Sequence, residues 1–249
     1  ASTGRPGPVV VDIPKDVTEP NRKVPYSFPN EVKMRSYQPS DRGHRGQIKR
    51  AIKALVSAKR PVIYSGGGVI IDNASELLIS VARKLNFPVT NTLMGLGAFP
   101  GTDRQFVGML GMHGTFEANT AMHHADVIFA VGARFDDRVT NELEKFCPFA
   151  TIIHIDIDPT TVSKNIVADI PIVGTCKSVL AEVLSLLEQS NDEVDQDALS
   201  QWWQQIDEWR AKHGIYTASR YEDSYDDTIK PQDVIKTLYN VTKGDAIVT

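Results

Sequence analysis

Apolar and polar positions in the middle of the chain follow two alternating periodicities. Short runs rich in branched and aromatic residues, bounded by glycine, proline or polar residues, predict strands within 61–68, 87–93, 125–132, 150–158 and 171–174. Apolar residues at helical spacing predict helices at about 40–59, 77–85, 115–124 and 176–189, with Asp72 or Asn73 as the N-cap of the second. Strands that alternate with helices predict an α/β fold: a doubly wound, mostly parallel sheet with helices on both faces.

The segments on either side of this region lack the regular alternation of predicted strands and helices. Residues 8–13 (PVVVDI) predict a short strand, and residues 18–40 contain several prolines with little periodicity, as an extended linker does. An acidic stretch precedes a predicted helix at about 198–213, and residues 231–249 resemble the first helix and strand of another α/β unit. We therefore expect a piece of a longer polypeptide, divided into 1–20, a linker at 21–39, a central domain at 40–190, a helical linker at 191–227 and the start of a further domain at 228–249.

Composition narrows the class of protein. The chain has 249 residues, of which 41% are hydrophobic and 23% charged, so it can bury a sizeable core. A net charge of −4 gives no basic surplus for nucleic acid, and no apolar run approaches the roughly 20 residues that span a bilayer. Cys147 and Cys176 lack metal-ligand spacing, which predicts buried, reduced thiols. We expect a cytoplasmic protein without nucleic-acid or membrane partners.

Glycine-rich or charged stretches follow the ends of several predicted strands. They are SGGG (65–68), TLMGLGAFPG (92–101), MLGMHGTFEAN (109–119), GARFDDRV (132–139) and the two acids of HIDID (154–158). In an open parallel sheet, ligands bind outside the carboxyl ends of the strands. Glycine lets backbone amides approach an anion, and an acid after a later strand can accept hydrogen bonds from ribose hydroxyls. Together these stretches predict a long cleft for an extended, phosphate-bearing ligand such as a dinucleotide, although the GxGxxG fingerprint is absent.

Each stretch also has a plainer interpretation. SGGG suits a tight strand-to-helix turn, His113 a structural loop position, and the charges of GARFDDR a solvated ion-pair turn. No Ser/His/Asp or Cys/His order, GxSxG motif or metal-ligand cluster stands out in the sequence. Asp136 and Asp137 would point to opposite sides of an extended backbone, so they suit the orientation of arginines and ligand hydroxyls better than paired acid–base chemistry.

The same segments, in their order and spacing, resemble the acetohydroxyacid synthase (acetolactate synthase) family of thiamine-diphosphate enzymes, in its large, catalytic subunit. GRPGPVVVDIPKDV (4–17) and ADVIFAVGARFDDRVT (125–140) belong to the resemblance, which runs from the first residues to the last. The family has pyrimidine-binding, central and diphosphate-binding α/β domains. The resemblance implies that residues 1–20 end the first, that the Rossmann-like central domain binds a structural FAD, and that residues 228–249 begin the third. The ligands of thiamine diphosphate and Mg²⁺ would lie outside this chain.

The resemblance also implies individual site residues. The implied FAD contacts are Arg35, Gly66, Gly67, Gly68, Thr92, Leu93, Met94, Leu110, Gly111, Met112, His113, Gly132, Ala133, Arg134, Asp136, Val139, Asp156 and Ile157. Arg138 is implied to hold the carboxylate of the second 2-ketoacid, which suits a bidentate guanidinium. Thr175 follows Gly174, where the family often has an acid, so a negative charge is lost there.

The family's reaction decarboxylates pyruvate on thiamine and condenses the product with pyruvate or 2-ketobutyrate, at the start of branched-chain amino-acid synthesis. The full-length enzyme is implied to be a homo-oligomer with a regulatory small subunit. No catalytic residue is expected in this chain, so we expect it to be inactive alone. Two alternatives stay open: a stand-alone nucleotide-binding or interaction module, and the central domain of a glyoxylate carboligase, oxalyl-CoA decarboxylase or pyruvate oxidase. MLGMHGTFEAN and GARFDDRVT favour the synthase.

Overall fold

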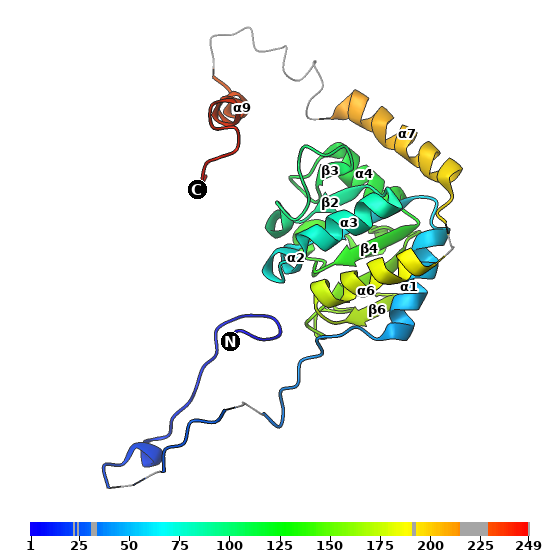
Figure 1. Ribbon diagram of the computed structural model, residues 1–249. Coiled ribbons are helices and arrows are strands. Elements are labelled where there is room, and N and C mark those ends of the chain that lie inside the picture. The colour runs from blue at the N-terminus through cyan, green and yellow to red at the C-terminus, as the bar shows by residue number, and fades with distance from the viewer. Residues whose placement is uncertain (22, 24, 31–33, 191–192, 215–228, 249) are drawn as a thin grey trace.

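The body of the molecule is one parallel sheet with helices on both faces (Figure 1). The computed structural model describes residues 1–21, 23, 25–30, 34–190, 193–214 and 229–248. The six strands are β1 (Pro61–Ser65), β2 (Val89–Asn91), β3 (Phe106–Met109), β4 (Val127–Val131), β5 (Thr151–Asp156) and β6 (Ile170–Val173), in the order β3-β2-β1-β4-β5-β6. Every neighbouring pair is parallel. The predicted doubly wound α/β fold is confirmed.

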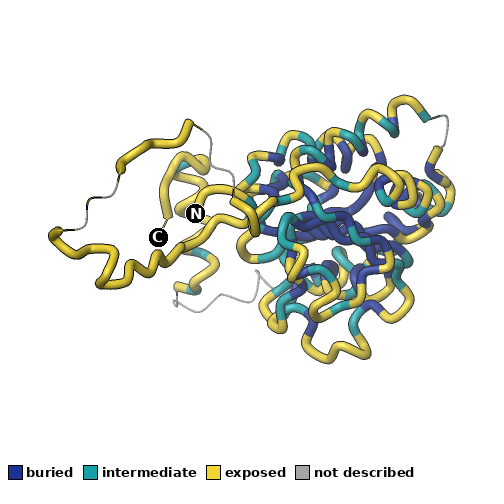
Figure 2. Tube along the Cα trace, turned by 90° about the horizontal axis from the view of Figure 1, so that it is seen from below, coloured by how far each residue is buried: buried dark blue, intermediate teal, exposed yellow. Residues whose placement is uncertain are grey.

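The helices form two layers. They are α1 (Arg45–Ser57), α2 (Gly67–Ile71), α3 (Ser75–Leu85), α4 (Phe116–His124), α5 (Asp137–Thr140), α6 (Cys176–Gln189), α7 (Gln196–His213) and α9 (Pro231–Thr242), with 3-10 turns η1 (Lys15–Thr18), η2 (Leu93–Gly95) and η3 (Leu143–Lys145). Helix α6 contacts α1 and α3, whereas α7 contacts α4. Figure 2 shows the buried sheet between these exposed layers. The connection from β4 to β5 contains only the short turns α5 and η3, and the one from β5 to β6 contains no helix, so that part of the sheet is thinly covered.

Strand β4 is apolar along its whole length, and β1 is so up to its last residue, Ser65, because both of their faces are covered. All five residues of β1 and all five of β4 are buried. On α6, Val179, Leu180 and Val183 form the buried stripe that the helical spacing predicts, and the helix has the predicted bounds. Its N-cap is Thr175, whose Oγ1 accepts a hydrogen bond from the Ser178 N–H at 3.1 Å.

Three predictions about the elements are wrong. Residues 8–13 form no strand and are exposed, because no other strand of the described chain pairs with them. Residues 245–248 likewise form no strand. Helix α3 begins at Ser75 with Ala74 as its N-cap, and Asp72 instead accepts a hydrogen bond from the Lys177 N–H at 2.5 Å. The edge strand β3 was not predicted, since it is short and contains a glycine. Among the described residues, no helix has the length and apolarity to cross a membrane.

Candidate cofactor-binding site

The loops after β1 and β4 meet at the point where the strand order reverses. Strand β1 lies between β2 and β4. After β1 the chain continues toward β2, and after β4 it continues toward β5, so the two connections diverge from the boundary between β1 and β4. The Gly68 N–H donates to the Gly132 carbonyl at 3.1 Å, and the Gly66 N–H donates to the Val131 carbonyl at 2.9 Å. Two of the stretches that the sequence places at strand ends are therefore in direct contact at the carboxyl edge.

The glycines at this point allow two backbones to pack together. A Cβ on Gly66 would overlap the carbonyl oxygen of Gly132, and one on Gly68 would lie 2.8 Å from the Gly132 Cα. Gly132 itself has a φ of +60°. The tight-turn interpretation of SGGG is confirmed for these residues. Gly67 differs, because its N–H begins α2 and is used by no hydrogen bond found in the described residues, which leaves a donor at the rim.

The loop after β2 closes against the same glycines. The Thr92 N–H donates to the Ser65 carbonyl at 2.9 Å, and the Thr92 Oγ1 accepts from the Gly95 N–H at 2.9 Å. A Cβ on Gly67 would lie 3.1 Å from the Cβ of Met94. The side chains of Leu93 and Met94 remain exposed beside the glycines. An apolar surface thus borders the point where the strand order reverses.

The loop after β3 lies against the loop after β4. A Cβ on Gly111 would lie 3.0 Å from the Arg138 carbonyl oxygen and 3.4 Å from a Val139 methyl group. Met112 and His113 follow, and both are exposed. The loops after four adjacent strands therefore contact one another along one edge.

GARFDDR alternates a buried aromatic ring with exposed charges. Phe135 is buried in spite of a φ of +50°, and its ring centroid lies 5.4 Å from that of Tyr64. On either side of it, Arg134 and Asp136 form an ion pair, and Asp136 caps α5 by accepting from the Arg138 N–H at 3.1 Å. Among the described residues, the Arg138 guanidinium has no ion-pair partner. The ion-pair turn exists, and it leaves one arginine free.

The end of β5 contributes an acid whose surroundings are mostly protein. Asp156 is buried, and its Oδ1 accepts from the Asp158 N–H at 2.9 Å. Ile157 is half-buried beside it. Arg35 is not joined to this group: it lies exposed in the linker, and no hydrogen bond or ion pair described for the chain connects it to the sheet edge. The structure thus brings together the candidates after β1 to β4, sets the β5 candidates next to them and leaves Arg35 outside.

Comparison with known proteins shows the family to which this α/β domain belongs. Residues 48–183, more than half of the chain, match the family model "Thiamine pyrophosphate enzyme, central domain". The chain belongs to this family. It is 57% identical over 249 residues to the acetolactate synthase isozyme 3 large subunit of Escherichia coli (strain K12). It is 56% identical over 248 residues to the acetolactate synthase large subunit of Haemophilus influenzae.

A relative of lower sequence identity is also described as an acetolactate synthase large subunit, and the chain again matches only part of its length. The chain is 41% identical over 262 aligned residues to the probable acetolactate synthase large subunit of Methanococcus aeolicus. In all three comparisons the whole chain is matched, but it spans only 42%, 42% and 43% of the relatives' lengths. The resemblance inferred from the motifs is confirmed at the level of the family and of these relatives.

This thiamine pyrophosphate enzyme domain contains a buried histidine that the sequence reading missed. His154, fully buried on β5, donates from Nε2 to the Ala133 carbonyl at 2.8 Å, and its Nδ1 has no hydrogen-bond partner in the described part of the chain. Its ring stands edge-on to Phe135, with centroids 5.0 Å apart. Burial lowers the pKa of His154, against the opposing effects of Asp156 and of the Ala133 carbonyl. The signal was a histidine in the middle of an otherwise apolar strand.

We expect the stability of the chain to fall on mild acidification because of His154. Its folded-state pKa lies below its ordinary value of 6.5, so as pH falls through that value the unfolded state takes up the proton first. The free energy of unfolding should therefore drop between pH 7 and pH 5. The His154→Gln variant keeps a donor toward Ala133, and its free energy of unfolding should drop less over the same pH range. Denaturant titrations of both proteins measure this, and equal slopes would contradict it.

The two thiols are structural in this domain. Cys147 and Cys176 are free and buried, as predicted. Burial raises the pKa of the Cys147 thiol well above its usual range, and burial, Asp72 and Asp156 raise the pKa of Cys176 to about 12. Neither sulfur is a nucleophile at neutral pH, since the reactive species is the thiolate.

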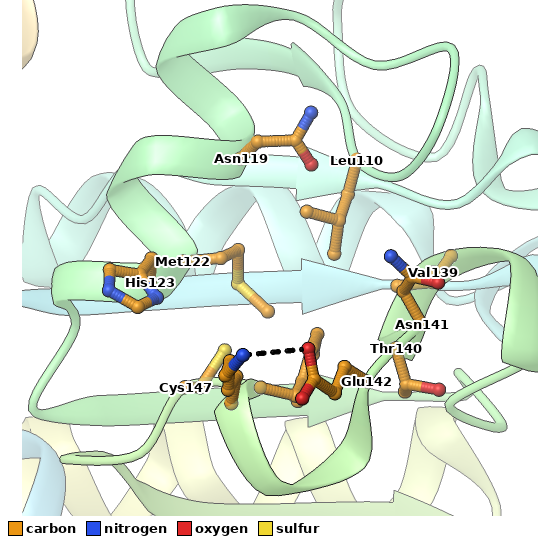
Figure 3. A pocket seen from close by; sticks show the side chains of 11 residues that line it. Leu110, Asn119, Met122, His123, Val139, Thr140, Asn141, Glu142 and Cys147 are labelled. Carbon is orange, nitrogen blue, oxygen red and sulfur yellow. Dashed lines mark ion pairs between the residues drawn. The ribbon is translucent and has the colours of Figure 1, made fainter.

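A hollow lies beside the rim, on the thinly covered face of the sheet. It has a volume of about 240 Å³ and lies between α4 and the segment containing α5 and η3 (Figure 3). Leu110, Met122, Val139 and Phe146 line it, together with Asn119. It shares only Leu110 and Val139 with the candidate residues, so it lies behind the loops after β3 and β4.

Proposed function

We propose that this chain is the central part of an acetolactate synthase large subunit and that its carboxyl sheet edge binds FAD. The observation that carries the proposal is the mutual contact of the loops after β1, β2, β3 and β4 at the point where the strand order reverses. Dinucleotides bind across this point in doubly wound sheets. The identity to acetolactate synthase large subunits supports the assignment to that enzyme.

The residues at the edge have the chemistry that FAD requires. Exposed Leu93, Met94 and Met112 offer apolar, polarizable surface to a flat ring system. The Arg134 guanidinium suits a phosphate, and the Asp156 carboxylate suits ribose hydroxyls. In the family that the chain resembles, FAD supplies a structural element and is not redox-cycled in the net reaction.

Arg138 is the proposed contact for the second substrate. Its side chain is exposed and free of ion pairs among the described residues, and its carbonyl oxygen lies against Gly111. A free guanidinium offers two parallel N–H donors to the carboxylate of pyruvate or 2-ketobutyrate. The arginine would therefore fix the orientation of the ketoacid beside the proposed FAD edge.

The rest of the chemistry would come from other parts of the enzyme. We place thiamine diphosphate and Mg²⁺ on the first and third domains, and the homo-oligomer, the regulatory small subunit and a cytoplasmic location belong to the same proposal. The condensation of two ketoacids then requires residues beyond this central domain. We accordingly expect the 249-residue chain to leave pyruvate unchanged.

FAD titration tests the proposal directly. FAD added to the 249-residue chain should lose fluorescence on binding, and FMN and NAD⁺ at the same concentrations should bind more weakly. Failure of FAD to bind would contradict the proposal. A bound flavin that is reduced during turnover would favour an oxidase. Consumption of pyruvate by this chain would contradict the proposal that thiamine diphosphate and Mg²⁺ are bound by the first and third domains.

A further inference from the structure

One side chain on α4 contacts the loop between β3 and α4 at two backbone atoms. The Asn119 Oδ1 accepts from the Gly111 N–H at 3.0 Å, and the Asn119 Nδ2 donates to the Gly111 carbonyl at 3.0 Å. The Gly114 N–H also donates to that carbonyl at 2.9 Å. Both polar groups of Gly111 are thus held by one amide from the second turn of the helix.

Asparagine is a poor residue for the interior of a helix. It is less favourable there than alanine, because its side chain competes for backbone hydrogen bonds. Asn119 lies within α4, beside the buried Ala118, and its two hydrogen bonds go to Gly111 instead of its own helix. The local cost of asparagine at this position is offset only through the loop.

The loop that Asn119 holds separates two candidate ligand sites. Gly111 has a φ of +107°, and a Cβ on it would lie 3.0 Å from the Arg138 carbonyl oxygen. Met112 and His113 come next and are exposed. Asn119, Gly111 and the backbone of Arg138 are therefore stacked in series, so that the position of Gly111 sets the spacing between the two sites.

The hollow lies behind this loop. Figure 3 shows Asn119 and Leu110 at one end of the cavity of about 240 Å³, with Val139 nearby. Gly111 itself does not line the hollow, but its neighbour Leu110 does, and side chains beside a void make fewer contacts than those in a filled core. The amide of Asn119 restrains both backbone groups of Gly111, whereas the Gly114 N–H holds only the carbonyl.

We propose that Asn119 is a positioning residue, which holds Gly111 so that Met112 and His113 face FAD and the backbone of Arg138 keeps its place. This inference rests on the proposed function, because it concerns the same FAD and ketoacid contacts. Asn119 is not among the implied ligand contacts, and both of its side-chain hydrogen bonds go to Gly111. Its effect is to order the loop before the cofactor binds, which lowers the entropic cost of binding.

The test compares the wild-type chain with Asn119→Ala, Asn119→Asp and Thr120→Ala. Asn119→Asp has the same size but loses the donor to the Gly111 carbonyl, and Thr120→Ala is the matched control on the next position of α4. We measure FAD affinity, hydrogen exchange of the peptide 108–116 and the melting temperature. Both Asn119 variants should exchange faster there and bind FAD about ten-fold more weakly, the loss expected from one or two hydrogen bonds. The control should match the wild type.

The outcomes separate the two proposals. Failure of the wild-type chain to bind FAD contradicts the proposed function, whatever the variants do. Unchanged exchange in Asn119→Ala overturns the inference, and so does faster exchange with unchanged FAD affinity. Asn119→Asp that behaves like the wild type also overturns it, because the amide would then only fill space. A fall in melting temperature that accounts for the weaker binding would assign Asn119 a purely structural role.

Discussion

Gly66→Ala is expected to lower the free energy of unfolding of this chain by about 3 kcal/mol, the upper end of the usual cost of overpacking. The added methyl group would overlap the carbonyl oxygen of Gly132, and both groups belong to backbone that follows a central strand. Neither can move without disturbing the pairing of β1 with β4. Urea titration followed by circular dichroism measures the change.

Gly101→Ala is the matched control for that substitution. A Cβ at Gly101 would meet no atom within 4 Å, and its backbone has no positive φ. Its free energy of unfolding should stay within about 0.5 kcal/mol of the wild type, as for most surface changes. If Gly66→Ala unfolds at the same urea concentration as Gly101→Ala, the close contact at this edge is not what holds the two loops together.

Arg138→Gln is expected to raise the KM for the second ketoacid by about 100-fold in a polypeptide that contains all three domains. The change removes a charge and a bidentate donor, and hydrogen bonds to charged groups contribute about 1.5–3 kcal/mol each. Because Arg138 is exposed and without an ion-pair partner among the described residues, the free energy of unfolding should be unaffected. Steady-state kinetics with varied 2-ketobutyrate, alongside thermal melts, measure both.

Two further variants define what Arg138 contributes. Arg138→Lys keeps the charge but loses the planar fork, so its KM should lie between those of the wild type and the glutamine variant. Arg60→Gln removes an exposed arginine that precedes β1, at the opposite edge of the sheet, and should leave KM unchanged. A KM in Arg138→Gln equal to that of Arg60→Gln would exclude a role in substrate binding.

Periodicity was enough to find most of the central domain. Strands β1 and β4 are mostly apolar runs bounded by turn residues, β5 has a mostly apolar first half, and α6 has the bounds that its stripe predicts. The rule that parallel strands end at one edge also predicted that the loops after them would lie together. These features depend on residues close in sequence, so local pattern is sufficient for them. The predicted strand at 8–13 is wrong because pairing depends on a partner that the pattern does not supply.

The pattern of hydrophobic and polar residues could not predict which distant segments contact each other. The chain order does not reveal that β1 lies between β2 and β4, and it is this order that brings Gly66 against Gly132. Asn119 and His154 are ordinary residues in a helix and a strand until the fold places them against Gly111 and Ala133. Hydrophobic spacing indicates which face of an element is buried, whereas the identity of the neighbour depends on how the whole chain packs. That packing turned separate loops into one candidate site.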